Sequence, residues 1–107
     1  MTLIHTVETI YSHFGLDRKQ AVAAVRPLLY GTLQNIETKG TVPALTGPIA
    51  RGDAETIRKH VRNLKRELPG LLEAYCALGV LTVGIALEKK SLSPEGAAEI
   101  LKILGGR

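Results

Sequence analysis

The stretch from Leu71 to Lys90 limits the possible folds more than any other feature of this chain. Nearly every residue from Leu71 to Leu87 is apolar, so a helix formed there has almost no polar face. Such a helix is expected to be buried on all sides, within a helical bundle or against another chain. A transmembrane span is the competing interpretation, but the run falls short of the ~20 residues usually needed and contains Glu73. We therefore expect no membrane partner.

The rest of the chain is also helical in pattern. Apolar residues recur at helical spacing in four other segments, and no segment alternates long enough to indicate a strand. The expected helices cover about residues 3–14, 17–40, 54–68 and 93–104. The apolar face of the second should comprise Ala21, Val25, Leu28, Leu29, Leu33 and Ile36, with a kink at the internal Pro27. The fold class is therefore all-α, a bundle of about five helices.

Size and composition point to one helical domain, residues 1–107. Aromatic residues make up only 4% and tryptophan is absent, so the core must be aliphatic. The single cysteine, Cys76, excludes an intrachain disulfide and a multi-thiolate metal site, and its apolar setting indicates a small core residue. The N-terminus lacks the plan of a signal peptide, which favours a cytoplasmic location.

A loop punctuated by glycine and proline joins the second and third expected helices, over residues 44–53. Pro48 restricts the backbone and resists helix, whereas Gly47 and Gly52 permit conformations closed to other residues. Asp53 stands where its carboxylate can cap the helix that follows. This pattern fits a binding edge, and it equally fits a well-made connection between two helices.

The residue types suggest two kinds of site to consider, a metal site and a surface that contacts phosphates. The three histidines, His5, His13 and His60, are far apart and no pair has the spacing of metal ligands, so no metal site is expected. The third helix carries a basic side that suits phosphate contacts. Glutamates are interspersed on that helix and no aromatic residue is available to stack bases, so a solvated outer face is the favoured interpretation. The basic residues are Arg58, Lys59, Arg62, Lys65 and Arg66.

The chain as a whole resembles a known helical domain. The segments that carry the resemblance are residues 27–29, 31–35, 44–53, 56–60 and 75–79. They are similar to the C-terminal domain of uncharacterised Rossmann-like NADP-dependent oxidoreductases. Those proteins are related to ketopantoate reductase, pyrroline-5-carboxylate reductase and the 6-phosphogluconate dehydrogenase superfamily.

The resemblance implies an all-α domain, like the 6-phosphogluconate dehydrogenase C-terminal domain, that forms a homodimer. It would close one side of a cleft shared with an N-terminal Rossmann domain, which is absent here, so the chain is expected to be a fragment and inactive alone. No cofactor is expected in this chain, and NADP is implied for the parent protein. The resemblance marks Thr46, Arg51, Asp53, Thr32 and Asn35 as cleft-facing or loop-fixing residues. Candidates for the dimer interface are Tyr75, Leu78, Leu81, Val83 and Ile85.

Two other functions stay open from the sequence. One is a free-standing helical module that contacts nucleic acid through the basic third helix, with salt-dependent binding as its signature. The other is a purely structural oligomerisation domain. The oxidoreductase interpretation is preferred because the resemblance spans nearly the whole chain.

Overall fold

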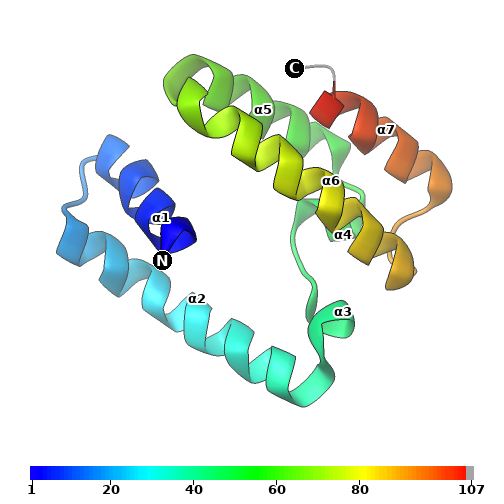
Figure 1. Cartoon of the computed structure of the whole chain (residues 1–107), viewed down its shortest axis with the longest axis horizontal. Coiled ribbons are helices and arrows are strands. Elements are labelled where there is room, and N and C mark those ends of the chain that lie inside the picture. Colours follow the sequence, from blue (N-terminus) through cyan, green and yellow to red (C-terminus); the bar gives the residue numbers. More distant parts are fainter. Residues whose placement is uncertain (106–107) are drawn as a thin grey trace. The chain divides into compact units, whose positions relative to one another are not determined.

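A computed structural model describes residues 1–105 of the chain, and helices are the only regular elements in that range (Figure 1). The all-α prediction is confirmed. The helices fall into two compact units: the first is Met1–Gly40 and the second begins at Thr41.

The first unit is a pair of packed helices, α1 (Thr2–His13) and α2 (Arg18–Lys39). The turn between them ends in a capping box formed by Asp17 and Gln20. The backbone N–H of Gln20 donates to Asp17 Oδ1 at 2.8 Å, and the backbone N–H of Asp17 donates to Gln20 Oε1 at 2.9 Å. This reciprocal pair satisfies two donors at the start of α2 and defines where the helix begins.

The expected apolar face of α2 is only partly buried. Ala21 and Val25 are in the interior, but Leu28, Leu29, Leu33 and Ile36 are exposed. The reason is length: at a rise of 1.5 Å per residue, α1 spans about 18 Å and α2 about 33 Å, so α1 covers only the first half of its neighbour. The helix continues through Pro27 without interruption.

The second unit contains the other helices. Its elements are α3 (Thr41–Ala44), α4 (Pro48–Arg51), α5 (Ala54–Glu67), the 3-10 turn η1 (Pro69–Leu71), α6 (Leu72–Glu88) and α7 (Pro94–Gly105). The long helices match the expected ones, but the estimate of about five helices missed α3 and α4. The prolines that argued against helix lie within the first turn of these short elements, where no intrahelical donor is needed.

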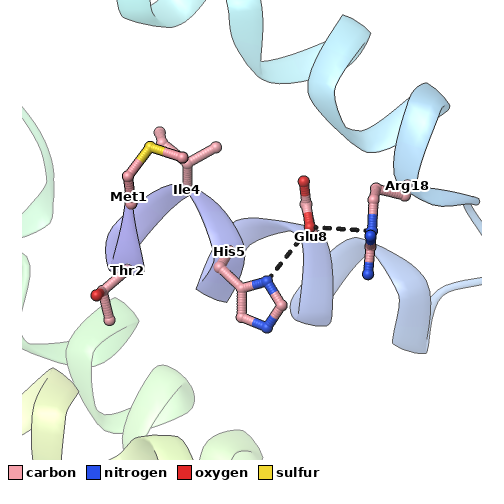
Figure 2. A pocket seen from close by; sticks show the side chains of 6 residues that line it. All are labelled: Met1, Thr2, Ile4, His5, Glu8 and Arg18. Carbon is pink, nitrogen blue, oxygen red and sulfur yellow. Dashed lines mark ion pairs between the residues drawn. The ribbon is translucent and has the colours of Figure 1, made fainter.

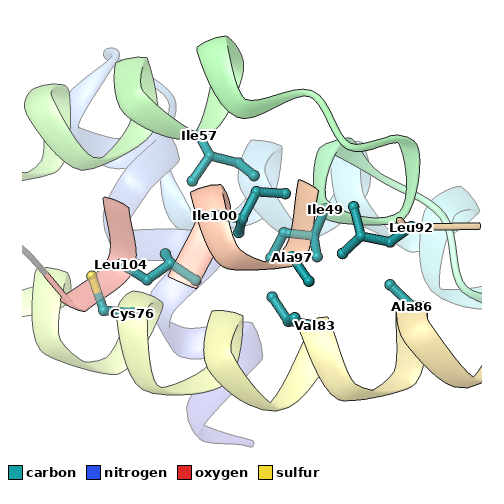
Figure 3. Packing of buried hydrophobic residues seen from close by; sticks show 9 residues of the cluster. All are labelled: Ile49, Ile57, Cys76, Val83, Ala86, Leu92, Ala97, Ile100 and Leu104. Carbon is teal, nitrogen blue, oxygen red and sulfur yellow. The ribbon is translucent and has the colours of Figure 1, made fainter. Parts of the chain in front are cut away.

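The core of the second unit forms where α4, α5, α6 and α7 meet (Figure 3). Ile57, Ile100 and Leu104 are completely buried, and Cys76 is the small core residue that the sequence predicted. Gly79 permits the close approach of α7, because a Cβ atom there would lie 2.9 Å from Leu104 Cδ1. The nine buried residues of this core are Ile49, Ile57, Cys76, Val83, Ala86, Leu92, Ala97, Ile100 and Leu104.

Helix α6 is buried on one side only, so the expectation of burial on all sides is not met within this chain. Its inner side faces the core through Cys76, Gly79, Val83 and Ala86. The opposite side is exposed and still apolar. We call this surface the exposed α6 face; it comprises Ala74, Ala77, Leu78, Leu81 and Gly84.

Among the described residues, one helical stretch, Pro69–Glu88, is long and apolar enough to cross a membrane. Length and composition alone are weak evidence, since the core helix of a soluble protein has the same properties. The cytoplasmic location stays a prediction.

Candidate functional site

The loop over residues 44–53 is held by its own backbone hydrogen bonds. Gly47 (φ 102°) and Gly52 (φ 70°) occupy the left-handed region at either end of α4, where only glycine is unstrained. Between them, the N–H of Arg51 donates to the carbonyl of Gly47 at 3.2 Å, and the N–H of Asp53 donates to that of Pro48 at 2.9 Å. The loop therefore has a defined, hydrogen-bonded conformation within the second unit.

Asp53 caps α5, as the sequence predicted. Its Oδ1 accepts from the backbone N–H of Thr56 at 3.1 Å, and its Oδ2 accepts from the Thr56 hydroxyl at 2.7 Å. These two hydrogen bonds, the hydroxyl first, hold the pKa of the Asp53 carboxyl below its ordinary value, with Arg51 and Lys59 adding favourable charge. The carboxylate stays ionised and fixes the geometry of the loop's end.

A second anchor lies at the start of the loop. The ammonium group of Lys89, at the end of α6, donates to the carbonyl oxygen of Leu45 at 2.6 Å. This contact joins residues that are far apart in the sequence and ties the loop to α6. It also brings a positive charge next to Thr46.

The loop forms one wall of a pocket of about 220 Å³ within the second unit. Helices α5 and α6 supply the rest of the wall. We call it the loop pocket; its lining residues are Thr46, Pro48, Ile49, His60, Tyr75 and Thr82. It is smaller than the ~300–1,000 Å³ of pockets that hold drug-sized ligands.

His60 and Tyr75 make the most chemically useful contact of the loop pocket. His60 Nδ1 lies 2.9 Å from the Tyr75 hydroxyl oxygen, and the two rings meet edge to face with centroids 5.8 Å apart. Burial raises the pKa of the Tyr75 phenol, with a smaller effect from Cys76, so the phenol keeps its proton at neutral pH. A neutral imidazole and the phenol therefore hold one exchangeable proton between them, and one further donor is left.

The residues that the resemblance marked are distributed over both units. Thr46 lines the loop pocket, Arg51 ends α4 on the surface, and Asp53 fixes the loop. Thr32 and Asn35 are exposed on α2, in the first unit. Their participation in a shared cleft stays a prediction.

The candidates for a dimer interface differ in their exposure to solvent. Leu81 is 69% exposed and Leu78 is exposed beside it, whereas Val83 is only 2% exposed and belongs to the core. Val83 therefore cannot contact a partner while the second unit is folded, because its side chain faces inward. Tyr75 and Ile85 are half-buried.

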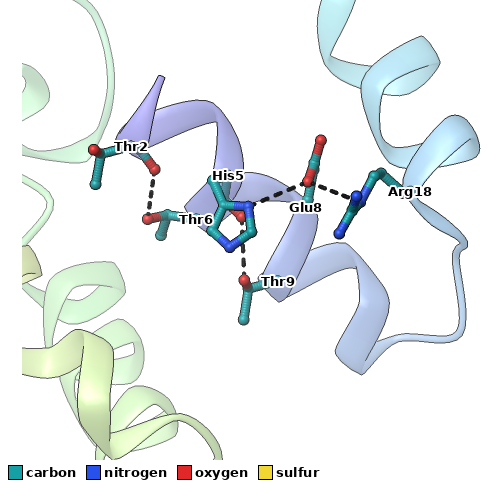
Figure 4. A network of polar contacts seen from close by, with 6 residues as sticks. All are labelled: Thr2, His5, Thr6, Glu8, Thr9 and Arg18. Atoms are coloured by element: carbon teal, nitrogen blue, oxygen red, sulfur yellow. Dashed lines mark hydrogen bonds and ion pairs between the residues drawn. The ribbon is translucent and has the colours of Figure 1, made fainter.

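The first unit has a hollow of its own, of about 490 Å³, beside the start of α1 (Figure 2). Glu8 Oε2 lies 3.5 Å from His5 Nδ1 and 3.4 Å from Arg18 Nε, so the imidazole and the guanidinium group share one carboxylate (Figure 4). The hydroxyls of Thr6 and Thr9 donate to backbone carbonyls four residues earlier. The Glu8–Arg18 ion pair links α1 to the start of α2.

The basic side of α5 is partly neutralised. Arg58 is paired with Glu99 of α7, Lys59 Nζ lies 3.1 Å from Glu55 Oε1, and Arg66 is paired with the adjacent Glu67. A phosphate would have to compete with these carboxylates. The nucleic-acid hypothesis stays a prediction without structural support.

From the sequence, His60 is a histidine without the spacing of a metal ligand, and Tyr75 is a candidate for the dimer interface. Their partnership was missed because they lie fifteen positions apart on different helices. One signal was present: His60 stands at the edge of the apolar stripe of α5, and Tyr75 is the only aromatic residue of α6.

Fold and site together define an all-α protein with a fixed loop beside a small, mostly apolar pocket that carries a few polar groups. The model of a family described as Domain of unknown function (DUF2520) matches residues 1–82, and this chain belongs to that family. The matched range includes the whole loop and every residue that lines the loop pocket. No curated protein and no solved structure matches the chain.

Proposed function

We propose that this chain is the helical, substrate-side and dimerisation domain of an NAD(P)-dependent oxidoreductase, and that it is not catalytic alone. The observation that carries the proposal is the loop pocket. The segment with the most specific resemblance to the oxidoreductase domains, residues 45–53, also forms one wall of this pocket. A loop that served only as a connection would have no need of polar neighbours on two other helices.

The exposed α6 face supports the dimerisation part of the proposal. Leu78 and Leu81 form an apolar centre, and Ala74, Ala77 and Gly84 are small enough for a second helix to approach closely. A second copy related by a two-fold axis would present the same apolar surface to it. Covering these side chains removes apolar area from water at roughly 25 cal/mol per Å².

The cofactor part of the proposal is consistent with the fold. Residues 1–105 contain helices only, so they include no strand–turn–helix unit of the kind that binds dinucleotides. The nicotinamide cofactor would therefore be held by another domain, and this chain would contribute the loop pocket.

The test compares the isolated chain with the native gene product. An antibody raised against this chain would be used to recover the gene product from its own cells, and NADPH binding would be followed by the fluorescence of the reduced nicotinamide. We expect the recovered protein to bind NADPH and the isolated chain to show no binding. Absence of NADPH and NADH binding in the recovered protein, or binding by the isolated chain, would contradict the proposal.

A further inference from the structure

Helix α2 carries a row of exposed side chains that is separate from its buried residues. The row consists of Arg26, Tyr30, Leu33 and Glu37, which are spaced four, three and four positions apart and therefore lie along one side of the helix. Tyr30 is 67% and Leu33 57% exposed, and the two charged side chains are exposed as well. We call this row the outer α2 stripe. Two large side chains with apolar surface thus lie between a cation and an anion.

The charges at the two ends of the stripe have no ionic partner within residues 1–105. Neither Arg26 nor Glu37 takes part in an ion pair there, although other charged residues of the chain do. A single exposed apolar side chain is ordinary on a protein surface. The order of this row is more specific, because it reads as cation, apolar, apolar, anion in one direction and as its charge-reversed copy in the other.

This order is self-complementary when two α2 helices run antiparallel. If Arg26 of each copy lies opposite Glu37 of the other, then Tyr30 of each copy lies opposite Leu33 of the other, because the spacing is symmetric. A two-fold axis produces each of these contacts twice. In a parallel pair, by contrast, the arginines would face each other and so would the glutamates, which is unfavourable.

We infer that the outer α2 stripe is a self-association surface, covered by the same stripe of a second copy in an antiparallel pair. Charge complementarity is the reason for choosing a second copy as the occupant, since both charged ends find an opposite charge there. The inference rests on the proposed function, because it adds a contact to the dimer that the exposed α6 face would form. Four side chains from each copy make a contact well below the size of a stable interface, so the stripe strengthens this dimer and does not hold it alone.

Charge reversal on the full chain tests this contact, with the dissociation constant of the dimer measured by analytical ultracentrifugation. Arg26→Glu and Glu37→Arg should each raise the dissociation constant by about tenfold, because like charges then face each other at both ends of the pair. The double variant carries both changes and restores opposite charges. Its dissociation constant should return to within about threefold of the wild-type value. The effects of the single variants should shrink as salt is added.

Lys19→Glu is the matched control. It makes the same change of charge as Arg26→Glu, on the same side of α2 and two turns earlier. In the antiparallel pair, the position opposite Lys19 is 44, which lies beyond the end of α2 at Lys39. Its dissociation constant should therefore equal that of the wild type. Circular dichroism checks that each variant keeps its helices, as expected for changes at exposed positions.

The outcomes separate this inference from the proposed function. Single reversals that act no more strongly than Lys19→Glu, or a double variant that does not recover, would overturn the α2 contact while a dimer held by the exposed α6 face still stands. A wild-type chain that stays monomeric would overturn the contact and the dimerisation part of the proposed function together. NADPH binding by the native gene product takes no part in this experiment and stays a separate result.

Discussion

Two hydrogen bonds from Thr56 make the Asp53 carboxylate part of the loop and part of α5 at once. This role was predictable from the sequence, because an aspartate between a glycine and a helical pattern has a local function. The pairing of His60 with Tyr75 was not predictable in the same way. The pairing depends on how α5 and α6 pack, and the sequence around His60 gives no sign of Tyr75 as its partner.

Asp53→Ala should destabilise the second unit near neutral pH by exposing the start of α5. The pKa of Asp53 is lower in the folded protein than its ordinary value of 3.8, so its carboxylate stabilises the fold above that pH. This contribution is lost as the pH falls through the lowered pKa. Thermal unfolding followed by circular dichroism should therefore show a gap between wild type and variant at pH 7 that closes below about pH 3.8. A gap that is constant with pH would contradict the assignment.

At the scale of elements, helical periodicity located the long helices, and capping residues placed their starts. It did not reveal α3 and α4, since four-residue helices are too short to show a period. The sequence also overstated burial. Periodicity identifies an apolar face but not what covers it, which is why Leu33, on the expected apolar face of α2, is exposed.

Substitution with glutamate should have different effects on the two sides of helix α6. Leu81→Glu should give a folded monomer, because the exposed α6 face loses its partner while the core is untouched. Val83→Glu should abolish folding, since an unpaired charge in the core costs several kcal/mol or more. Light scattering and circular dichroism measure the two effects. Leu101→Glu, at an exposed position of α7, is the control and should keep the wild-type mass; a Leu81→Glu variant that does the same would contradict the interface.

The glycines of α6 provide a second comparison. Gly79→Ala should destabilise the second unit by about 1–3 kcal/mol, because the new Cβ atom crowds the buried Leu104 side chain. Gly84→Ala meets no atom within 4 Å and should stabilise the helix by up to about 1 kcal/mol. Both are best measured by urea unfolding in the Leu81→Glu background, which removes dimerisation from the comparison. A neutral Gly79→Ala would show that α7 is not packed as described.

At the scale of the molecule, the sequence predicted an all-α fold and the structure resolves it into two compact units. The division falls at Gly40, the residue that ends α2. The membership in a family of unknown function agrees with the coarse part of the resemblance. Periodicity does not indicate what covers an exposed apolar face, so the proposed dimer partner could not be derived from it.

The basic side of α5 is expected not to bind nucleic acid. At low salt, the chain should show no measurable affinity for DNA or RNA by fluorescence anisotropy, because its cations are partly paired with carboxylates. Binding that falls steeply with salt, and that disappears when Arg58, Arg62 and Arg66 are changed to alanine, would favour the nucleic-acid alternative.

The most direct test of the central claim is the mass of the native gene product, measured by immunoblot of its own cells with an antibody against this chain. The account predicts a band of more than twice 11.5 kDa, large enough to include a nucleotide-binding domain. A single band at 11.5 kDa would contradict it and would make this chain a free-standing binding protein.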